Sequence, residues 1–224
     1  MSRKSCLVLI RHGQSTYNEK NLFTGWEDVE LTDQGIREAH EVAPLIQNLT
    51  FSYAFTSKLK RAQHTLDIIL KDILQDFPVT EDTALNERDY GNLVGQNKAE
   101  AAEKYGAEQV QIWRRSYSTP PPDGESLEMT ANRCIPYFKE KIEPLLEGNN
   151  NIIVSAHGNS IRSIVMHLHH LNSEQILQTE IGWCEPWIYT FENGEKIGFK
   201  ITPRPSSNSQ SYLPKVSEPF IQTN

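Results

Sequence analysis

Two short segments that read as strands constrain the fold of this chain most strongly. Cys6–Ile10 is a continuous apolar run, which is typical of a strand buried on both faces of a sheet. Asn151–Ala156 is a second clear strand, and further strands are expected at Phe51–Phe55, Trp187–Phe191 and Lys196–Ile201. Helical patterns lie between several of these strands. The sequence therefore predicts a three-layer α/β/α sandwich around a mostly parallel sheet.

The helical segments carry recognisable start and stop signals. Thr32 is the expected N-cap of a helix whose apolar face includes Ile36, Ala39 and Ile46. Pro44 lies inside this pattern and predicts a kink or an early end. Ser126 is expected to begin a later helix. These signals place most helix boundaries before any tertiary contact is known.

Composition excludes several classes of protein. The chain has 224 residues, a net charge of −7 and 38% hydrophobic residues, which is enough for a core and argues against disorder. The acidic balance argues against nucleic acid as a partner. No apolar run approaches the ~18 residues of a membrane span. Three widely spaced cysteines outside any CxxC pattern indicate a reducing compartment, so we expect a cytoplasmic protein with no membrane partner.

Two histidines follow strands in the same local setting. The first strand runs into Arg11-His12-Gly13, and the later strand runs into His157-Gly158-Asn159. Ligands of open parallel sheets bind beyond the carboxyl ends of the strands, where both histidines are expected. A single histidine after a strand is usually structural, but two in matched settings favour a functional site.

Cationic side chains then recur at helix starts and in loops. They are Arg11, Arg61, Arg88, Lys98, Arg114 and Arg115. Each alone is most simply a surface charge, but gathered near the histidines they would bind a substrate with several negative charges. Glu87 could then donate and accept protons, although an ion-paired loop glutamate is the simpler interpretation.

The motifs together resemble one family. They are Leu-Ile-Arg-His-Gly-Gln-Ser (9–15), Asn18, Phe-Thr-Gly-Trp (23–26), Thr-Ser-Lys-Leu-Lys-Arg-Ala (56–62), Leu-Asn-Glu-Arg-Asp-Tyr-Gly (85–91), Asn-Lys-Ala-Glu (97–100), Trp-Arg-Arg (113–115) and Ala-His-Gly-Asn-Ser (156–160). This pattern is similar to cofactor-dependent phosphoglycerate mutases of the histidine phosphatase superfamily. The resemblance implies a mutase-like catalytic domain at residues 1–201. Residues 202–224, rich in Ser, Pro and Asn, are expected to form a mobile tail.

The resemblance also implies roles for individual residues. His12 would be the phosphorylated nucleophile, Arg11, Arg61 and His157 would surround the phosphoryl group, and Glu87 would move protons. The implied substrate-binding residues are Gly13, Gln14, Ser15, Asn18, Thr24, Gly25, Arg88, Tyr90, Lys98, Arg114, Arg115, Gly158 and Asn159. The enzyme would interconvert 2-phosphoglycerate and 3-phosphoglycerate through 2,3-bisphosphoglycerate, which primes His12. No metal is implied, and both a monomer and a homodimer are compatible with the sequence.

Two alternatives stay open at this stage. A histidine phosphatase on the same scaffold would pass the phosphoryl group from small phosphate esters to water. A non-catalytic protein that binds phosphorylated metabolites would be expected to lack His12, Glu87 or His157, yet all three are present. Two departures from the family pattern concern the site: Gln14 replaces a frequent glutamate, and Gly182–Pro186 replaces a Pro-Thr-Gly-x-Pro loop.

Overall fold

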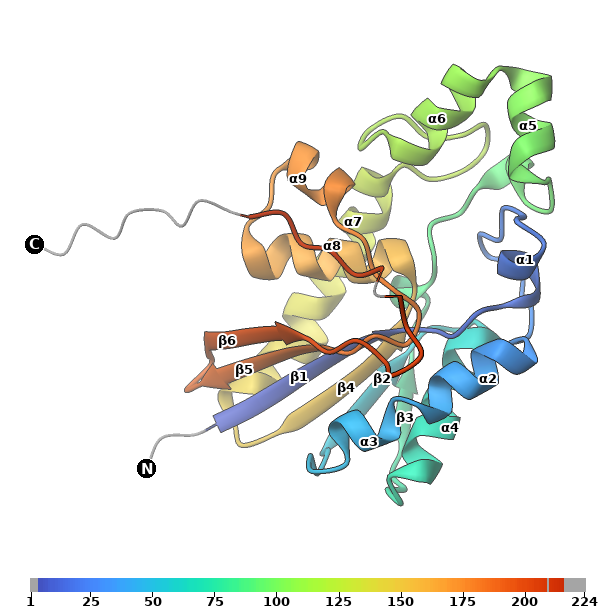
Figure 1. Ribbon diagram of the computed structural model, residues 1–224. Helices are drawn as coiled ribbons and strands as arrows, with labels where there is room; N and C mark the ends of the chain where they lie inside the picture. Colours follow the sequence, from blue (N-terminus) through green and yellow to red (C-terminus); the bar gives the residue numbers. More distant parts are fainter. Residues whose placement is uncertain (1–3, 209, 216–224) are drawn as a thin grey trace, which may run out of the picture.

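The computed structural model describes residues 4–208 and 210–215. Within these ranges, six strands form one sheet in the order β3-β2-β4-β1-β5-β6 (Figure 1). The strands are β1 (Lys4–Arg11), β2 (Tyr53–Thr56), β3 (Val79–Glu81), β4 (Asn151–Ala156), β5 (Trp187–Glu192) and β6 (Glu195–Ile201). Strands β1 to β4 are parallel, β5 is antiparallel to β1, and β6 is antiparallel to β5. The predicted, mostly parallel sheet is confirmed.

Helices cover both faces of the sheet. The helices are α1 (Thr16–Glu19), α2 (Asp33–His40), α3 (Ala43–Ile46), α4 (Lys60–Asp72), α5 (Lys98–Tyr105), α6 (Ala107–Arg115), α7 (Leu127–Tyr137), α8 (Gly158–His169) and α9 (Ser173–Gln178). Short 3₁₀ turns lie at Thr83–Leu85, Gly91–Leu93 and Glu143–Glu147, and a π-helical turn lies at Phe138–Ile142.

The core is divided into two layers by the alternation of side chains along the central strands. Leu7 and Leu9 of β1 pack with α7 and α8 on one face of the sheet. Val8 and Ile10 pack with α2, α3 and α4 on the other face. Both layers are visible above and below the sheet in Figure 1. The three-layer α/β/α architecture is therefore confirmed, because β1 needs a helical layer on each side.

The expected helix boundaries depend on local chemistry and are confirmed. The hydroxyl of Thr32 accepts a hydrogen bond from the Gly35 amide at the start of α2, and Ser126 accepts one from the Met129 amide at the start of α7. Helix α2 ends at His40, and Pro44 lies in the first turn of the separate helix α3. Proline is tolerated there because the first-turn amides have no intrahelical partner.

Two features differ from the sequence-based prediction. Strand β3 was not expected, since it has only three residues, none of them fully buried, and is defined by its pairing with β2. Ile36 was assigned to the apolar face of its helix but is 39% exposed. Helix α2 approaches the chain after β1 so closely that a Cβ at Gly35 would overlap the Gln14 backbone, and Ala39 is buried on this helix while Ile36 turns toward solvent.

Helices α5 and α6 form a separate small layer beyond the end of the sheet (Figure 1). Their core consists of Phe23, Leu93, Ala101 and Val110, all of which are buried. The amide of Lys98 donates to the carbonyl of Asn21, which ties the start of α5 to the loop after α1. This layer places Lys98 at the start of α5, and Arg114 and Arg115 at the end of α6, near the carboxyl ends of β1 and β4.

The chain after β6 returns to the body of the protein. Arg204 is 7% exposed and pairs with Glu38 and Glu41, and Ser211 donates its amide hydrogen to the buried carboxylate of Glu185. These contacts involve the first part of the predicted tail, 202–208 and 210–215. Residues 216–224 lie outside the described residues, so the division into a 1–201 domain and a mobile 202–224 tail stays a prediction.

Gly35 is expected to tolerate no side chain. A Cβ atom at this position would overlap the backbone oxygen of Gln14, just after the proposed nucleophile. Gly35→Ala should therefore lower the free energy of unfolding by roughly 3 kcal/mol, because neither backbone segment can move away. Urea unfolding measures this loss. The matched control is Gly198→Ala in β6, where a Cβ would meet its nearest neighbour, Thr190, at 3.6 Å. Equal stability of the two variants would contradict the prediction.

No helix among the described residues is long and apolar enough to cross a membrane.

Candidate active site

The two strand-end histidines lie side by side. Strands β1 and β4 are parallel neighbours with Arg11 opposite Ala156, and the His12 amide donates to the Ala156 carbonyl at 3.0 Å. The ring centroids of His12 and His157 are consequently 5.0 Å apart. The register of the two strands thus brings together residues that are 145 positions apart in the sequence.

His12 is held as a neutral imidazole with one free nitrogen. Its Nδ1 lies 2.6 Å from the carbonyl oxygen of Gly13. A carbonyl only accepts, so Nδ1 carries the proton and Nε2 keeps its lone pair. Burial lowers the pKa of His12 well below its usual value, and the charges of Arg61 and Arg11 lower it further. His12 lines the cavity, so a nucleophilic nitrogen is available at neutral pH.

His157 lies beside His12 and is the N-cap residue of α8. Its Nε2 lies 2.7 Å from the hydroxyl of Ser57, whose oxygen also accepts the Leu59 amide hydrogen. Because Nε2 is the acceptor that the described residues offer to the Ser57 hydroxyl hydrogen, Ser57 donates to Nε2 and Nδ1 carries the proton of the neutral ring. This buried Nδ1 has no hydrogen-bond partner among the described residues. Burial and then Arg61 lower the pKa of His157, so it is a neutral donor beside His12.

Two guanidinium groups, one buried and one half-buried, complete this end of the cavity. Arg61, only 1% exposed, donates to the carbonyls of Gly25 and Glu27, both at 2.9 Å. Arg11 donates to the carbonyl of Ile181 at 2.8 Å and stacks over the Trp183 ring, with 5.3 Å between the guanidinium carbon and the ring centroid. The Nε atoms of both arginines are buried without a partner in the part of the chain that the structure describes. Unpaired buried donors are costly, and oxygens of an anion would satisfy them.

Burial lowers the pKa of Arg61 to about 10 and also lowers that of Arg11. Carboxylates act in the opposite direction in both cases, with Glu87 the strongest. Arg61 therefore remains charged at neutral pH and contributes to a positive potential at His12.

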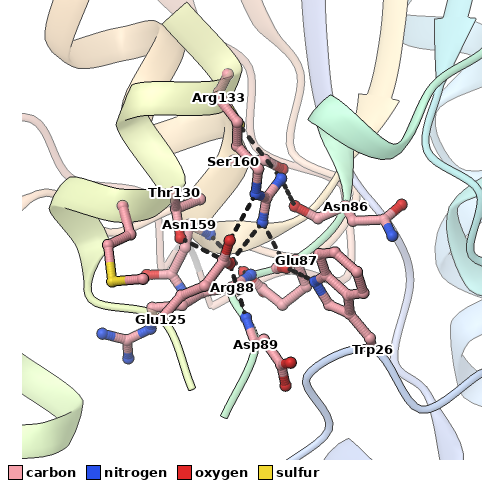
Figure 2. A network of polar contacts seen from close by, with 12 residues as sticks. Trp26, Asn86, Glu87, Arg88, Asp89, Glu125, Thr130, Arg133, Asn159 and Ser160 are labelled. Atoms are coloured by element: carbon pink, nitrogen blue, oxygen red, sulfur yellow. Dashed lines mark hydrogen bonds and ion pairs between the residues drawn. The ribbon is translucent and has the colours of Figure 1, made fainter. Parts of the chain in front are cut away.

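Glu87 is fixed by a network of polar contacts (Figure 2). Its Oε1 accepts the amide hydrogens of Arg88 at 2.8 Å and Asn159 at 3.1 Å. Its backbone carbonyl accepts from Trp26 and from Arg133, which is itself paired with Glu125. Because Oε1 is occupied, Oε2 is the oxygen available for chemistry.

The free oxygen of Glu87 faces the cationic end of the cavity. A Cβ added at Gly158 would lie 3.7 Å from this Oε2 and equally far from the Arg11 guanidinium. Glycine at 158 therefore leaves a clear path between the carboxylate and the charged groups around His12.

Three further cations enter the same cavity from the small layer. Lys98 is the first residue of α5, and Arg114 and Arg115 are the last two of α6. Burial lowers the pKa of Lys98. The cavity has a volume of about 210 Å³. Cations from the sheet edge and from the small layer thus line one space suited to a small, multiply charged anion.

The structure brings most of the predicted site residues to this cavity. Those that line it are Arg11, His12, Asn18, Thr24, Gly25, Arg61, Glu87, Tyr90, Lys98, Arg114, Arg115, Gly158 and Asn159. Five predicted residues are adjacent to it but are not among its lining residues, namely Gly13, Gln14, Ser15, Arg88 and His157.

The adjacent residues have structural partners of their own. The amide of Gln14 donates to Glu38 at 2.7 Å, and its side-chain oxygen accepts from Thr32 at 2.9 Å. Ser15 caps α1. Arg88 donates to the hydroxyl of Tyr90 at 2.8 Å and stacks over its ring. Arg88 therefore acts on the cavity wall through Tyr90.

Five further residues line the cavity and were not among the predicted site residues. They are Leu22, Phe23, Arg162, Glu180 and Ile181. Arg162 had a usable signal, because it follows Asn159 by three positions and so shares its face of α8. Glu180 lies between α9 and β5 and had none.

The unusual Gly182–Pro186 loop has two contacts that account for its sequence. Trp183 stacks against Arg11, as described above. Glu185 is fully buried and accepts hydrogen bonds from Ser207 and from the Ser211 amide at 3.0 Å. The loop therefore links the end of the cavity beside Arg11 and His12 to the chain that follows β6.

Stability should fall as the solution becomes acidic. Burial lowers the pKa of His12 and His157, and burial with the charge of Lys196 lowers that of His169 to about 4. The unfolded chain, with histidine pKa values near 6.5, then binds more protons than the folded chain. The free energy of unfolding should therefore decrease as the pH falls below about 6.5.

Urea unfolding between pH 7.5 and 5 measures this dependence. A His169→Gln variant isolates one group outside the cavity and should reduce the proton uptake on unfolding by up to about one proton. An unchanged pH slope in this variant would contradict the assignment.

Most of this chain is similar to known proteins. The model of the histidine phosphatase superfamily (branch 1) matches residues 7–198. A protein of Cytophaga hutchinsonii named 2,3-bisphosphoglycerate-dependent phosphoglycerate mutase is 52% identical over 187 residues, which is 84% of this chain and 88% of that protein. A protein of the same name from Parvibaculum lavamentivorans is 52% identical over 190 residues, covering 84% of this chain and 90% of the relative.

Solved structures share the fold. A putative alpha-ribazole-5'-P phosphatase from Escherichia coli has a TM-score of 0.76 and 22% identity, covering 88% of this chain and 95% of that one. A phosphoglycerate mutase from Bacillus anthracis has a TM-score of 0.68 and 21% identity, covering 88% and 92%. At these identities the likeness concerns the fold alone.

Proposed function

This chain belongs to branch 1 of the histidine phosphatase superfamily, and from that premise we propose that it is a 2,3-bisphosphoglycerate-dependent phosphoglycerate mutase. It interconverts 2-phosphoglycerate and 3-phosphoglycerate. The observation that carries the proposal is the second group of cations, Lys98, Arg114 and Arg115, in the same cavity as His12. Hydrolysis of one phosphate ester needs only the first group, whereas a substrate with a carboxylate and a phosphate uses both.

The cavity suits the bisphosphorylated cofactor. Buried Nε atoms of Arg11 and Arg61 and Nδ1 of His157 are donors without a partner among the described residues. They surround His12 and would bind the oxygens of one phosphate, while Lys98, Arg114 and Arg115 would hold the second phosphate and the carboxylate. When bound, 2,3-bisphosphoglycerate supplies the phosphoryl group that primes the enzyme.

His12 performs the transfer. Its Nε2 lone pair forms the bond to phosphorus while the bond from phosphorus to the substrate oxygen breaks, which gives a phosphohistidine. Arg11 and Arg61 neutralise charge on the three equatorial oxygens, and His157 donates a hydrogen bond to one of them. Phosphorylated His12 passes the group to the free hydroxyl of a bound monophosphoglycerate, and His12 then takes the other phosphoryl group of the resulting bisphosphate, which leaves the other isomer.

Glu87 moves the proton. Its Oε2 protonates the departing substrate oxygen when His12 is phosphorylated, and it removes the proton of the attacking hydroxyl when the group returns. The two backbone hydrogen bonds to Oε1 hold the carboxylate in place throughout.

The proposal includes a cytoplasmic location and a small phosphorylated substrate as partner. Three free, buried cysteines support a reducing compartment.

Phosphorus NMR tests the proposal. The protein is mixed with 3-phosphoglycerate and a trace of 2,3-bisphosphoglycerate in the presence of a chelator. Growth of the 2-phosphoglycerate signal that requires the bisphosphate is the expected result. Inorganic phosphate in place of that signal would mean that water reaches phosphorylated His12, and the protein would be a histidine phosphatase.

A further inference from the structure

A second carboxylate lies in the cavity besides Glu87. Glu180 is in the connection between α9 and β5, and its Oε1 lies 2.6 Å from Nη1 of Arg115. Its Oε2 lies 2.7 Å from Nη2 of Arg162. One carboxylate therefore bridges two of the guanidinium groups that line the cavity.

The two arginines differ in what else holds them. Arg162 also donates to the carbonyl of Thr179 at 2.7 Å and to the side-chain oxygen of Asn159 at 3.3 Å. Its side chain is only 12% exposed. Arg115 has a side chain that is 38% exposed, and among the described residues Glu180 is its only hydrogen-bonding partner. An anionic ligand can therefore replace Glu180 as the hydrogen-bonding partner of Arg115, whereas Arg162 keeps its other partners.

The backbone of Glu180 is fixed by the chain after β6. Its amide donates to the Tyr212 carbonyl, and the Tyr212 amide donates to the Glu180 carbonyl, both at 2.9 Å. This pairing, together with the bond to the well-buried Arg162, holds the carboxylate at the rim of the cavity. The carboxylate can give up Arg115 and retain Arg162.

We propose that Glu180 is a specificity-determining residue that competes with anionic ligands for Arg115 and weakens the binding of bisphosphorylated ligands more than that of monophosphorylated ones. This inference rests on the proposed function. Repulsion from a fixed negative charge increases with the charge of the ligand. A bisphosphoglycerate has one more phosphate than a monophosphoglycerate, so it bears most of the penalty. Glu180 thereby favours release of the cofactor from the cavity.

The test is Glu180→Gln, in which an amide of the same shape keeps the backbone pairing and removes the charge. Calorimetry in a His12→Asn background, which accepts no phosphoryl group, gives the dissociation constants of 2,3-bisphosphoglycerate and 3-phosphoglycerate with and without Glu180→Gln. We expect tighter binding by about tenfold for the bisphosphate and about threefold for the monophosphate. Both gains should shrink at high ionic strength, because the rim is exposed to solvent.

Glu81→Gln is the matched control. Glu81 pairs with Lys58 at 3.2 Å on the edge strand β3, and its side chain is 41% exposed, as is that of Glu180. It should leave both constants unchanged, which separates a local effect from a change in net charge.

Two results would overturn the inference. Weaker binding of both ligands in Glu180→Gln would mean that Glu180 serves to orient Arg115. An equal change for both ligands would mean that it does not discriminate by charge. Turnover of the wild type tests the mutase proposal separately. If the wild type turns over but Glu180→Gln does not favour the bisphosphate, only this inference is wrong. If Glu180→Gln favours the bisphosphate but the wild type does not turn over, only the mutase proposal is wrong.

Discussion

A His12→Asn variant is expected to lose mutase turnover by at least about 10⁴-fold and to accept no phosphoryl group. Asparagine can keep the hydrogen bond to the Gly13 carbonyl but has no lone pair on nitrogen that can attack phosphorus. The loss is therefore chemical, since the fold around β1 retains its contacts. Intact mass and incorporation of labelled phosphate from 2,3-bisphosphoglycerate measure the phosphoenzyme directly.

His170→Asn is the control for this experiment. His170 is exposed and ends α8 in a left-handed conformation, which asparagine adopts readily. Its turnover and phosphorylation should equal those of the wild type. Acid-labile phosphate on the His12→Asn protein would show that another residue is the nucleophile.

Glu87→Gln is expected to slow phosphoryl transfer by about 10²- to 10⁴-fold while leaving His12 able to accept the group. The amide oxygen of glutamine can still accept the Arg88 and Asn159 amide hydrogens, so the position of the side chain is kept. The variant loses the ability of Oε2 to donate a proton to the departing oxygen and to accept one from the attacking hydroxyl. Rapid-quench single turnovers separate the rate of transfer from the final extent of phosphorylation.

The expected pattern is a slow rate with an undiminished extent. Glu143→Gln, which alters a glutamate paired with His167 outside the cavity, should change neither quantity. Single-turnover rates equal to those of the wild type in Glu87→Gln would mean that a different group transfers the proton.

Most of the fold could be predicted because its signals are local. The Thr32 and Ser126 caps depend on a hydroxyl and an amide three residues apart, and the strand Cys6–Ile10 depends on an apolar run. Strand β3 has no such signal. Its three partly exposed residues are a strand only because β2 offers them a parallel partner.

Some candidate site residues could likewise be found from local signals, whereas others depend on packing. The histidines are found from the ends of strands, since parallel strands must share an edge. Lys98, Arg114 and Arg115 could be named as cations, but their convergence depends on how α5 and α6 pack around Phe23 and Val110. No spacing along the chain encodes that packing.

The order of the amino acids is enough to predict the layered sheet, the helix caps, the two histidines at strand ends and the family pattern. Tertiary contacts were needed to show that Nδ1 of His12 is held by the Gly13 carbonyl, that Trp183 stacks on Arg11, and that Glu180 bridges Arg115 and Arg162. The two groups of features differ in the sequence separation of the residues that interact. Periodicity and capping act over a few residues, whereas these contacts join segments brought together by strand register and by the return of the chain after β6.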